Sequence, residues 1–111
     1  MDMSVPFSQP ILIVGETRIA GTSAHPDRDD LCALLKAGDR LNLHREPENR
    51  EDTWAIRVST PNGQLLGYVA ADVNETIARL MDGGKHIYAV VNNVDIVHSW
   101  HKVWVGMYLD D

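Results

Sequence analysis

The sequence predicts a mainly β domain with two short helices, and three observations indicate this fold class. Apolar and polar residues alternate from Leu41 to His44, the period of a half-buried strand. Residues 61–63, Pro-Asn-Gly, separate two apolar runs, and Asn and Gly tolerate the positive φ that a tight hairpin needs. Between residues 73 and 81 the apolar side chains recur at helical spacing, and two glycines follow them.

Size and charge limit the classes of protein to consider. A chain of 111 residues suits one domain. We expect residues 1–10, with two prolines, to form an extended arm and residues 11–111 to form that domain. The formal net charge of −6 argues against strong non-specific binding of nucleic acid, which needs clustered Lys and Arg, but it permits a local basic patch. Because the sequence shows no basic leader and no long apolar run, we expect a cytoplasmic protein and no membrane partner.

In the first third of the chain, the sequence predicts a strand followed by a helix. Residues 11–14 are a β-branched run that starts the strand, and the glycines around residues 16–20 indicate a bulge or bend that lets a small sheet close. Asp27 or Asp29 is expected to cap the helix, and Gly38 to end it. Cys32, the single cysteine, is expected to be a buried small hydrophobe. The apolar face of this helix is predicted to comprise Leu31, Leu34 and Leu35.

In the central and last thirds of the chain, the sequence predicts five more strands and the second helix. After the strand at 41–44, residues 45–52 are charged and broken by a proline, so they must be a loop. Strands are predicted at 54–58 and 65–69. Asp72 and Glu75 resemble a capping box for the helix that follows. A strand over 86–97, a turn at 98–101 and a strand over 102–109 complete the chain. The predicted core comprises Ile13, Leu41, Leu43, Ile56, Val58, Leu66, Ile77, Leu80 and Val90.

The central stretch resembles a known family. Residues 45–58 follow the spacing Arg-Glu-Pro-x-Asn-x-x-Asp-x-x-Ala-Ile-x-Val, and Gly-Tyr stands at 67–68. This pattern is similar to that of the HIRAN domain, found at the N-terminus of some DNA-repair and fork-remodelling translocases and alone in small bacterial proteins. The resemblance continues more weakly over residues 13–92. It implies a six-stranded, OB-like barrel in the order strand, helix, three strands, helix, two strands.

The resemblance also implies a non-catalytic module that captures the 3′ end of single-stranded DNA. Asn49 and Asp52 match the family's pocket positions, where the Asp accepts a hydrogen bond from the terminal hydroxyl. A carboxylate suits this role because it accepts from a hydroxyl and repels a phosphate. Tyr68 and His25 are candidate stacking residues, and Arg45 is a further candidate contact.

Several of the family's DNA contacts are absent from this chain. The aromatic residue that precedes the Asp is replaced by Glu51, which cannot stack on a base and repels phosphate. By alignment, Ser23 and Ala24 stand where the DNA-capturing members have Arg and Tyr, and Ala71 replaces a Lys. The expected DNA binding is therefore weak.

Other interpretations stay open. Asn49 and Asp52 also suit a purely structural role, since both side chains often hold turns. Trp104 and Tyr108 share one face of the last strand, and three roles suit them: packing under the arm or a helix, stacking on bases, or forming a subunit interface. The alternative function is thus a protein-interaction or self-association module that keeps the fold without DNA.

The sequence offers little support for catalysis, a cofactor or a metal. It contains no Gly-x-Ser-x-Gly elbow and no phosphate-binding loop. His98 and His101 have no nearby third ligand, whereas zinc normally needs three or four. We therefore expect neither enzymatic activity nor a bound metal or cofactor.

Overall fold

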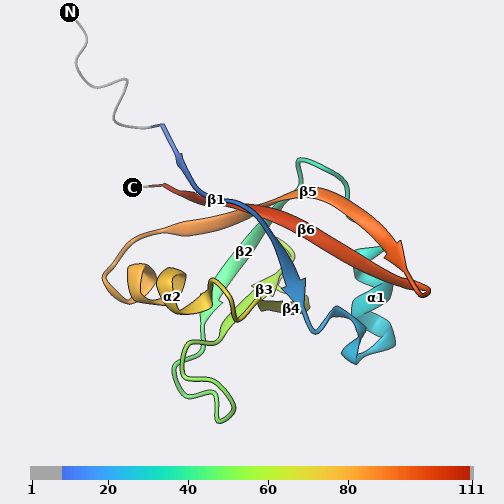
Figure 1. Cartoon of the computed structure of the whole chain (residues 1–111), viewed down its shortest axis with the longest axis horizontal. Coiled ribbons are helices and arrows are strands. Elements are labelled where there is room, and N and C mark those ends of the chain that lie inside the picture. Colours follow the sequence, from blue (N-terminus) through green and yellow to red (C-terminus); the bar gives the residue numbers. More distant parts are fainter. Residues whose placement is uncertain (1–8, 111) are drawn as a thin grey trace, which may run out of the picture.

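The computed structural model describes residues 9–110. The predicted arm of residues 1–10 lies almost entirely outside the described residues. The described part forms one closed antiparallel barrel in the order β1-β4-β3-β2-β5-β6, with β6 paired to β1 (Figure 1). The strands are β1 (Ile11–Ala20), β2 (Arg40–Arg45), β3 (Ile56–Ser59), β4 (Leu65–Val69), β5 (Ile87–Val97) and β6 (Trp100–Leu109).

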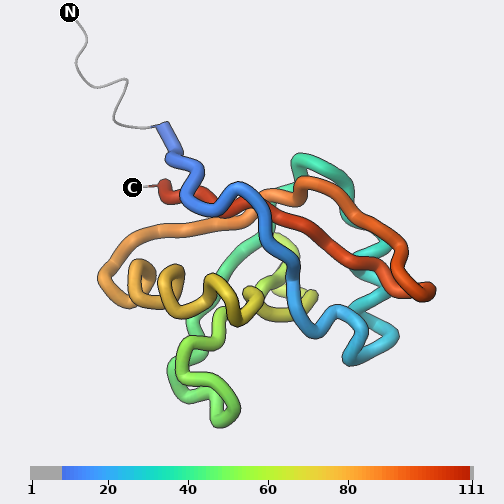
Figure 2. The backbone as a smooth tube through the Cα atoms, viewed as in Figure 1, coloured from blue at the N-terminus to red at the C-terminus, as the bar shows by residue number. Residues whose placement is uncertain are grey.

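Three short helical segments lie between these strands. A 3₁₀ turn, η2 (Thr22–Ala24), and α1 (Pro26–Cys32) connect β1 to β2. The helix α2 (Asn74–Asp82) connects β4 to β5. The predicted six-stranded barrel and its order of elements are therefore confirmed. Figure 2 shows β5 and β6 continuing together beyond the rest of the barrel, as a long hairpin that reaches toward α1.

The barrel closes because β1 changes partner along its length. Its first part pairs with β6, and its last two residues pair with Val69 and Tyr68 of β4. The β1–β6 register shifts twice between Leu12 and Thr17, next to the glycine at position 15, as expected for a bulge. At the β1–β4 crossing Gly67 is required, since a Cβ there would lie 2.3 Å from the carbonyl oxygen of Ala20.

The inward face of the strands forms the core. Six of the nine predicted core residues are buried, and two, Ile13 and Leu80, are partly buried and pack against the cluster. Val90 was wrongly predicted, because Ile87, Ala89 and Val91 take the inward positions of β5 and the alternation turns Val90 outward. The six confirmed residues are Leu41, Leu43, Ile56, Val58, Leu66 and Ile77.

The first predicted helix was too long and wrongly capped. His25 is the residue before α1, and Pro26 at the first position fixes the backbone angle with which a helix begins. Asp29 lies inside the first turn, where its carboxylate accepts a bond from the backbone N–H of His101 instead of capping. The helix ends at Cys32, so Leu34 falls in the following turn and is 74% exposed.

The boundaries of other elements also differ from the prediction. The Asp72–Glu75 capping box does not form, because Val73 is the residue before α2 and no side chain caps it. Residues 54 and 55 belong to the loop, and β3 begins at Ile56. The last turn is tighter than predicted: only His98 and Ser99 form it, with φ values of 50° and 74°, and Trp100 already belongs to β6.

Candidate functional site

The loop between β2 and β3, residues 46–55, is shaped by the side chain of Asn49. Its Oδ1 accepts from the backbone N–H groups of Glu51 at 2.9 Å and Asp52 at 3.2 Å. Its Nδ2 donates to Oε1 of Glu46 at 3.1 Å. Asn49 therefore performs the turn-holding role that its residue type suggested, while its side chain also lines the hollow described below.

Arg45 fastens the base of this loop. Its Nη1 donates to the carbonyl oxygen of Ala55 at 2.7 Å, and its Nη2 donates to that of Thr53 at 3.0 Å. Its Nε lies 2.8 Å from Oδ1 of Asp82, and the side chain is only 12% exposed. The hydrogen bond from Arg45 holds the pKa of Asp82 below its usual range. The guanidinium thus joins both ends of the loop to the C-terminal turn of α2.

Asp52 is held in place by two hydrogen bonds, one to each oxygen. Oδ1 accepts from the backbone N–H of Trp54 at 2.8 Å, and Oδ2 accepts from Nδ2 of Asn74 at 2.7 Å. A carboxylate has about four lone-pair sites, so both oxygens retain capacity to accept another bond. The carboxylate is consequently pre-oriented and still able to accept a hydrogen bond from a hydroxyl.

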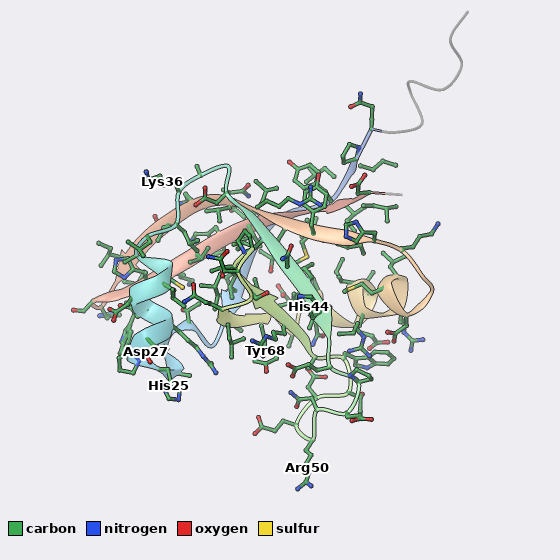
Figure 3. All side chains as sticks on the ribbon, turned by 180° about the vertical axis from the view of Figure 1, so that it is seen from behind. His25, Asp27, Lys36, His44, Arg50 and Tyr68 are labelled. Atoms are coloured by element: carbon green, nitrogen blue, oxygen red, sulfur yellow. The ribbon has the colours of Figure 1, made fainter. Side chains whose placement is uncertain are left out.

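A hollow of about 490 Å³, which we call the loop pocket, lies between this loop and β4. Its walls bring together Asn49, Asp52 and Tyr68, and Asn74 and Ala71 line it as well. Three of the five sequence-predicted binding residues therefore share one pocket. Figure 3 shows Tyr68 between His25, the residue before α1, and the loop that carries Arg50.

Tyr68 forms a wall of the loop pocket with its ring half-buried. Its hydroxyl donates to Oε1 of Glu46 at 3.0 Å. Burial raises the pKa of Tyr68, and the hydrogen bond from its hydroxyl to Glu46 raises it further. The phenol therefore stays protonated at neutral pH, and one side chain, Glu46, orients both Asn49 and Tyr68.

The other sequence candidates lie outside the loop pocket. His25 is exposed at the start of α1, and Arg45 is engaged at the base of the loop. Trp104 donates from Nε1 to Asp95 at 3.1 Å, with Nζ of Lys102 5.0 Å from its ring centroid. Tyr108 stacks on Tyr88 of β5, with ring centroids 5.5 Å apart. These two aromatic residues lie half-buried on the outer face of the β5–β6 ribbon.

Sequence reasoning missed Asn74 and Glu46, which orient Asp52, Asn49 and Tyr68. Asn74 is buried at the first position of α2. The available signal was a polar residue at the edge of the apolar stripe of this helix. A buried amide needs a hydrogen-bond partner, so this position indicates a contact with another polar group. Glu46 belongs to the Arg-Glu-Pro motif, but nothing local in the sequence indicates that it reaches Tyr68.

Among residues 9–110, no three His, Cys, Asp or Glu side chains come close enough together to hold a metal ion. Cys32 is buried as predicted, and burial raises the pKa of its thiol to about 11. His101 contacts Asp29, 3.2 Å away, rather than His98. None of the helices in this described part is long and apolar enough to cross a membrane.

Comparison with known proteins places the chain in a family. The family model of the HIRAN domain matches residues 14–104. The chain belongs to the HIRAN family. The search of curated proteins finds no match. The loop, the pocket and the barrel described above are therefore those of a HIRAN domain.

Solved structures share this HIRAN fold. A protein from Lactobacillus plantarum superposes with a TM-score of 0.81 and 26% identity, covering 91% of this chain and 95% of that one. The crystal structure of the HIRAN domain of human HLTF gives a TM-score of 0.67 at 20% identity, covering 85% of this chain and 72% of that one. The NMR structure of the same human domain gives 0.59 at 20% identity, with 92% and 80% covered.

Proposed function

We propose that this HIRAN domain is a non-catalytic nucleic-acid-binding module that captures the 3′ end of single-stranded DNA in the loop pocket. Membership of the family supports the general class of binding module. The arrangement of Asp52 carries the specific proposal. Its carboxylate lines the pocket, is fixed by Trp54 and Asn74, and retains free lone pairs.

The proposed recognition is a choice between a hydroxyl and a phosphate. A terminal 3′ hydroxyl donates a hydrogen bond to a carboxylate oxygen of Asp52. A continuing strand or a 3′ phosphate would place a second negative charge against the same carboxylate. Asp52 would therefore favour a free 3′ hydroxyl over a continuing strand and over a 3′ phosphate.

The same pocket limits the affinity. Tyr68 offers one aromatic face for a base, worth roughly 1–3 kcal/mol. Glu51 also lines the pocket with a further negative charge, and Ala71 supplies none of the positive charge that a Lys would give. We expect a dissociation constant in the micromolar range or higher, which corresponds to a binding free energy on the order of −8 kcal/mol at best. The affinity should fall further as salt is added.

The test is a titration of labelled single-stranded oligonucleotides that end in either a 3′ hydroxyl or a 3′ phosphate, at low salt. We expect the wild type to prefer the hydroxyl end and Asp52→Asn to lose that preference. Glu51→Gln is the matched control, because it removes one charge from the same pocket, and the structure shows only the backbone N–H of Glu51 in a loop bond. It should bind slightly tighter and keep the preference.

Equal binding of the two ends by the wild type would contradict end recognition, and so would an Asp52→Asn protein that still discriminates. Because Asp52 also accepts a bond from Asn74, thermal melts of both variants must show that they are folded. Asn74→Ala provides a second test: it keeps the carboxylate but removes one of the two hydrogen bonds that orient it, and should weaken discrimination without abolishing binding.

One observation favours the alternative, a self-association module. Ile96, Val97 and Trp100 at the end of the β5–β6 hairpin are exposed by 71%, 42% and 41%. Exposed apolar side chains on a projecting ribbon suit contact with a second copy of this chain. The candidate contact that we propose for this alternative is therefore the hairpin end, beyond Trp104 and Tyr108. Sedimentation over a range of concentrations tests it, and a mass that stays monomeric throughout would exclude it.

A further inference from the structure

The outer face of the barrel beside the loop pocket carries a row of side chains on four neighbouring strands. His44 of β2 lies opposite Arg57 of β3, and Arg57 lies opposite Tyr68 of β4. Tyr68 in turn lies opposite Ala20 of β1. Directly opposed residues of an antiparallel pair point to the same face, so these four side chains form one continuous line across the sheet.

Two arginines flank Tyr68 along this line. Arg57 is its neighbour on β3, and its Nη2 donates to the carbonyl oxygen of Gly63 at 3.2 Å. Arg28 comes from α1, and its Nη1 donates to the carbonyl oxygen of Gly21, next to Ala20 in the row, at 3.1 Å. A guanidinium has five N–H donors, so each of these contacts leaves most donors available to a ligand.

Both guanidiniums act electrostatically on the ring between them. Burial and Glu46 raise the pKa of the Tyr68 hydroxyl, and the positive charges of Arg57 and Arg28 oppose that rise. Two side chains from different elements, β3 and α1, therefore bring positive charge to the same tyrosine. This local concentration stands out on a protein whose formal net charge is −6.

The charge around Tyr68 is thus divided. On the side of the loop, Glu46, Glu51 and Asp52 supply acceptors and negative charge, which outweigh the single positive charge of Arg50 in the pocket lining. On the side of the row, Arg57 and Arg28 supply donors and positive charge. A ligand with a hydroxyl at one end and phosphates along the rest fits this division in one orientation only.

We propose that the phosphodiester groups nearest the captured end lie against Arg57 and Arg28, with the strand running from Asp52 over Tyr68 and out between these two arginines. This inference rests on the proposed function and adds the direction of the strand and the residues that replace the missing basic contacts. Bidentate guanidinium–phosphate pairs are among the stronger charge-assisted hydrogen bonds, so two of them offset part of the repulsion from Glu51.

The test compares Arg57→Gln and Arg28→Gln with Lys36→Gln as a matched control. Each variant loses one positive charge, but Lys36 lies on the segment between α1 and β2, well away from Tyr68 in Figure 3. Binding of a 3′-hydroxyl oligonucleotide is measured across a salt series. Each arginine variant should bind about 3- to 10-fold more weakly and lower the salt slope by about 0.7, the value for one phosphate contact on a single strand. Lys36→Gln should change neither.

A second experiment uses an oligonucleotide whose last internucleotide linkage is a neutral methylphosphonate. The wild type should bind it more weakly, and the double variant Arg28→Gln/Arg57→Gln should not distinguish it from the natural oligonucleotide. Arg57→Lys keeps the positive charge but loses the planar set of guanidinium donors. This variant should retain most of the salt slope even if its free energy of unfolding is slightly lower.

The outcomes separate the two proposals. If the wild type keeps its preference for the hydroxyl end but the arginine variants retain its affinity and salt slope, the strand direction is wrong and end capture stands. If the arginine variants lose no more affinity than Lys36→Gln, the same conclusion follows. If the wild type binds no single-stranded DNA at low salt, both the end capture and the strand direction are overturned.

Discussion

Asp52 and Asn49 combine structural and proposed binding roles at the scale of single residues. Asn49 satisfies two backbone N–H groups of the loop, and Asp52 satisfies a third. These bonds explain why the loop needs an amide and a carboxylate at those positions. They also fix the direction in which Asp52 faces the pocket, so the turn-holding interpretation and the binding interpretation describe the same contacts.

Ile56 tests the packing on which this geometry rests. It is fully buried at the start of β3, directly after the loop. Ile56→Ala should lower the free energy of unfolding by ~2–4 kcal/mol, because a buried cavity remains. Val90→Ala is the control, since Val90 faces outward on β5 and is only partly buried. It should cost clearly less in the same denaturant melt. A loss below ~0.5 kcal/mol for Ile56→Ala would contradict the register of β3.

The sequence predicted the residues of the loop pocket better than their partners. Asn49, Asp52 and Tyr68 carry local and family-like patterns, and the structure brings them together. Glu46 reaches Tyr68 and Asn74 reaches Asp52, each across 22 positions of sequence. Contacts of that separation depend on how the strands curve, which no local pattern encodes.

At the scale of elements, the strands were easier to predict than α1. Alternation fixes which side of a strand is buried, and this identified the inward faces of β2 and β3. The apolar run after Asp29 suggested a longer helix, yet α1 contains only seven residues. Asp29 is drawn into a bond with β6, a tertiary contact that overrides its capping preference.

Gly67 tests how the elements close into a barrel. A Cβ at this position would meet the backbone oxygen of Ala20 at 2.3 Å and Cγ2 of Ile19 at 2.8 Å. Gly67→Ala should therefore push β1 away from β4 and cost ~1–3 kcal/mol, as overpacking does. Gly15→Ala is the matched control, because nothing lies within 4 Å of the added carbon. If Gly67→Ala melted like the wild type and Gly15→Ala, the close β1–β4 crossing would be wrong.

At the scale of the whole molecule, two surfaces compete for a functional role. One is the loop pocket with its flanking arginines, and the other is the exposed apolar end of the β5–β6 hairpin. They adjoin at Ala20, which lines the loop pocket and also the hollow that Val97 and Trp100 line. The formal net charge of −6 makes a localised DNA contact more consistent with the molecule than a broad one.

The most direct test of the central claim is a map of backbone amide resonances while a short single-stranded oligonucleotide with a 3′ hydroxyl is added. End capture in the loop pocket predicts that the largest changes occur at Glu51, Asp52, Tyr68 and Asn74, and that they shrink when the oligonucleotide carries a 3′ phosphate. Changes confined to residues 96–100, or changes of equal size for the two ends, would contradict the account.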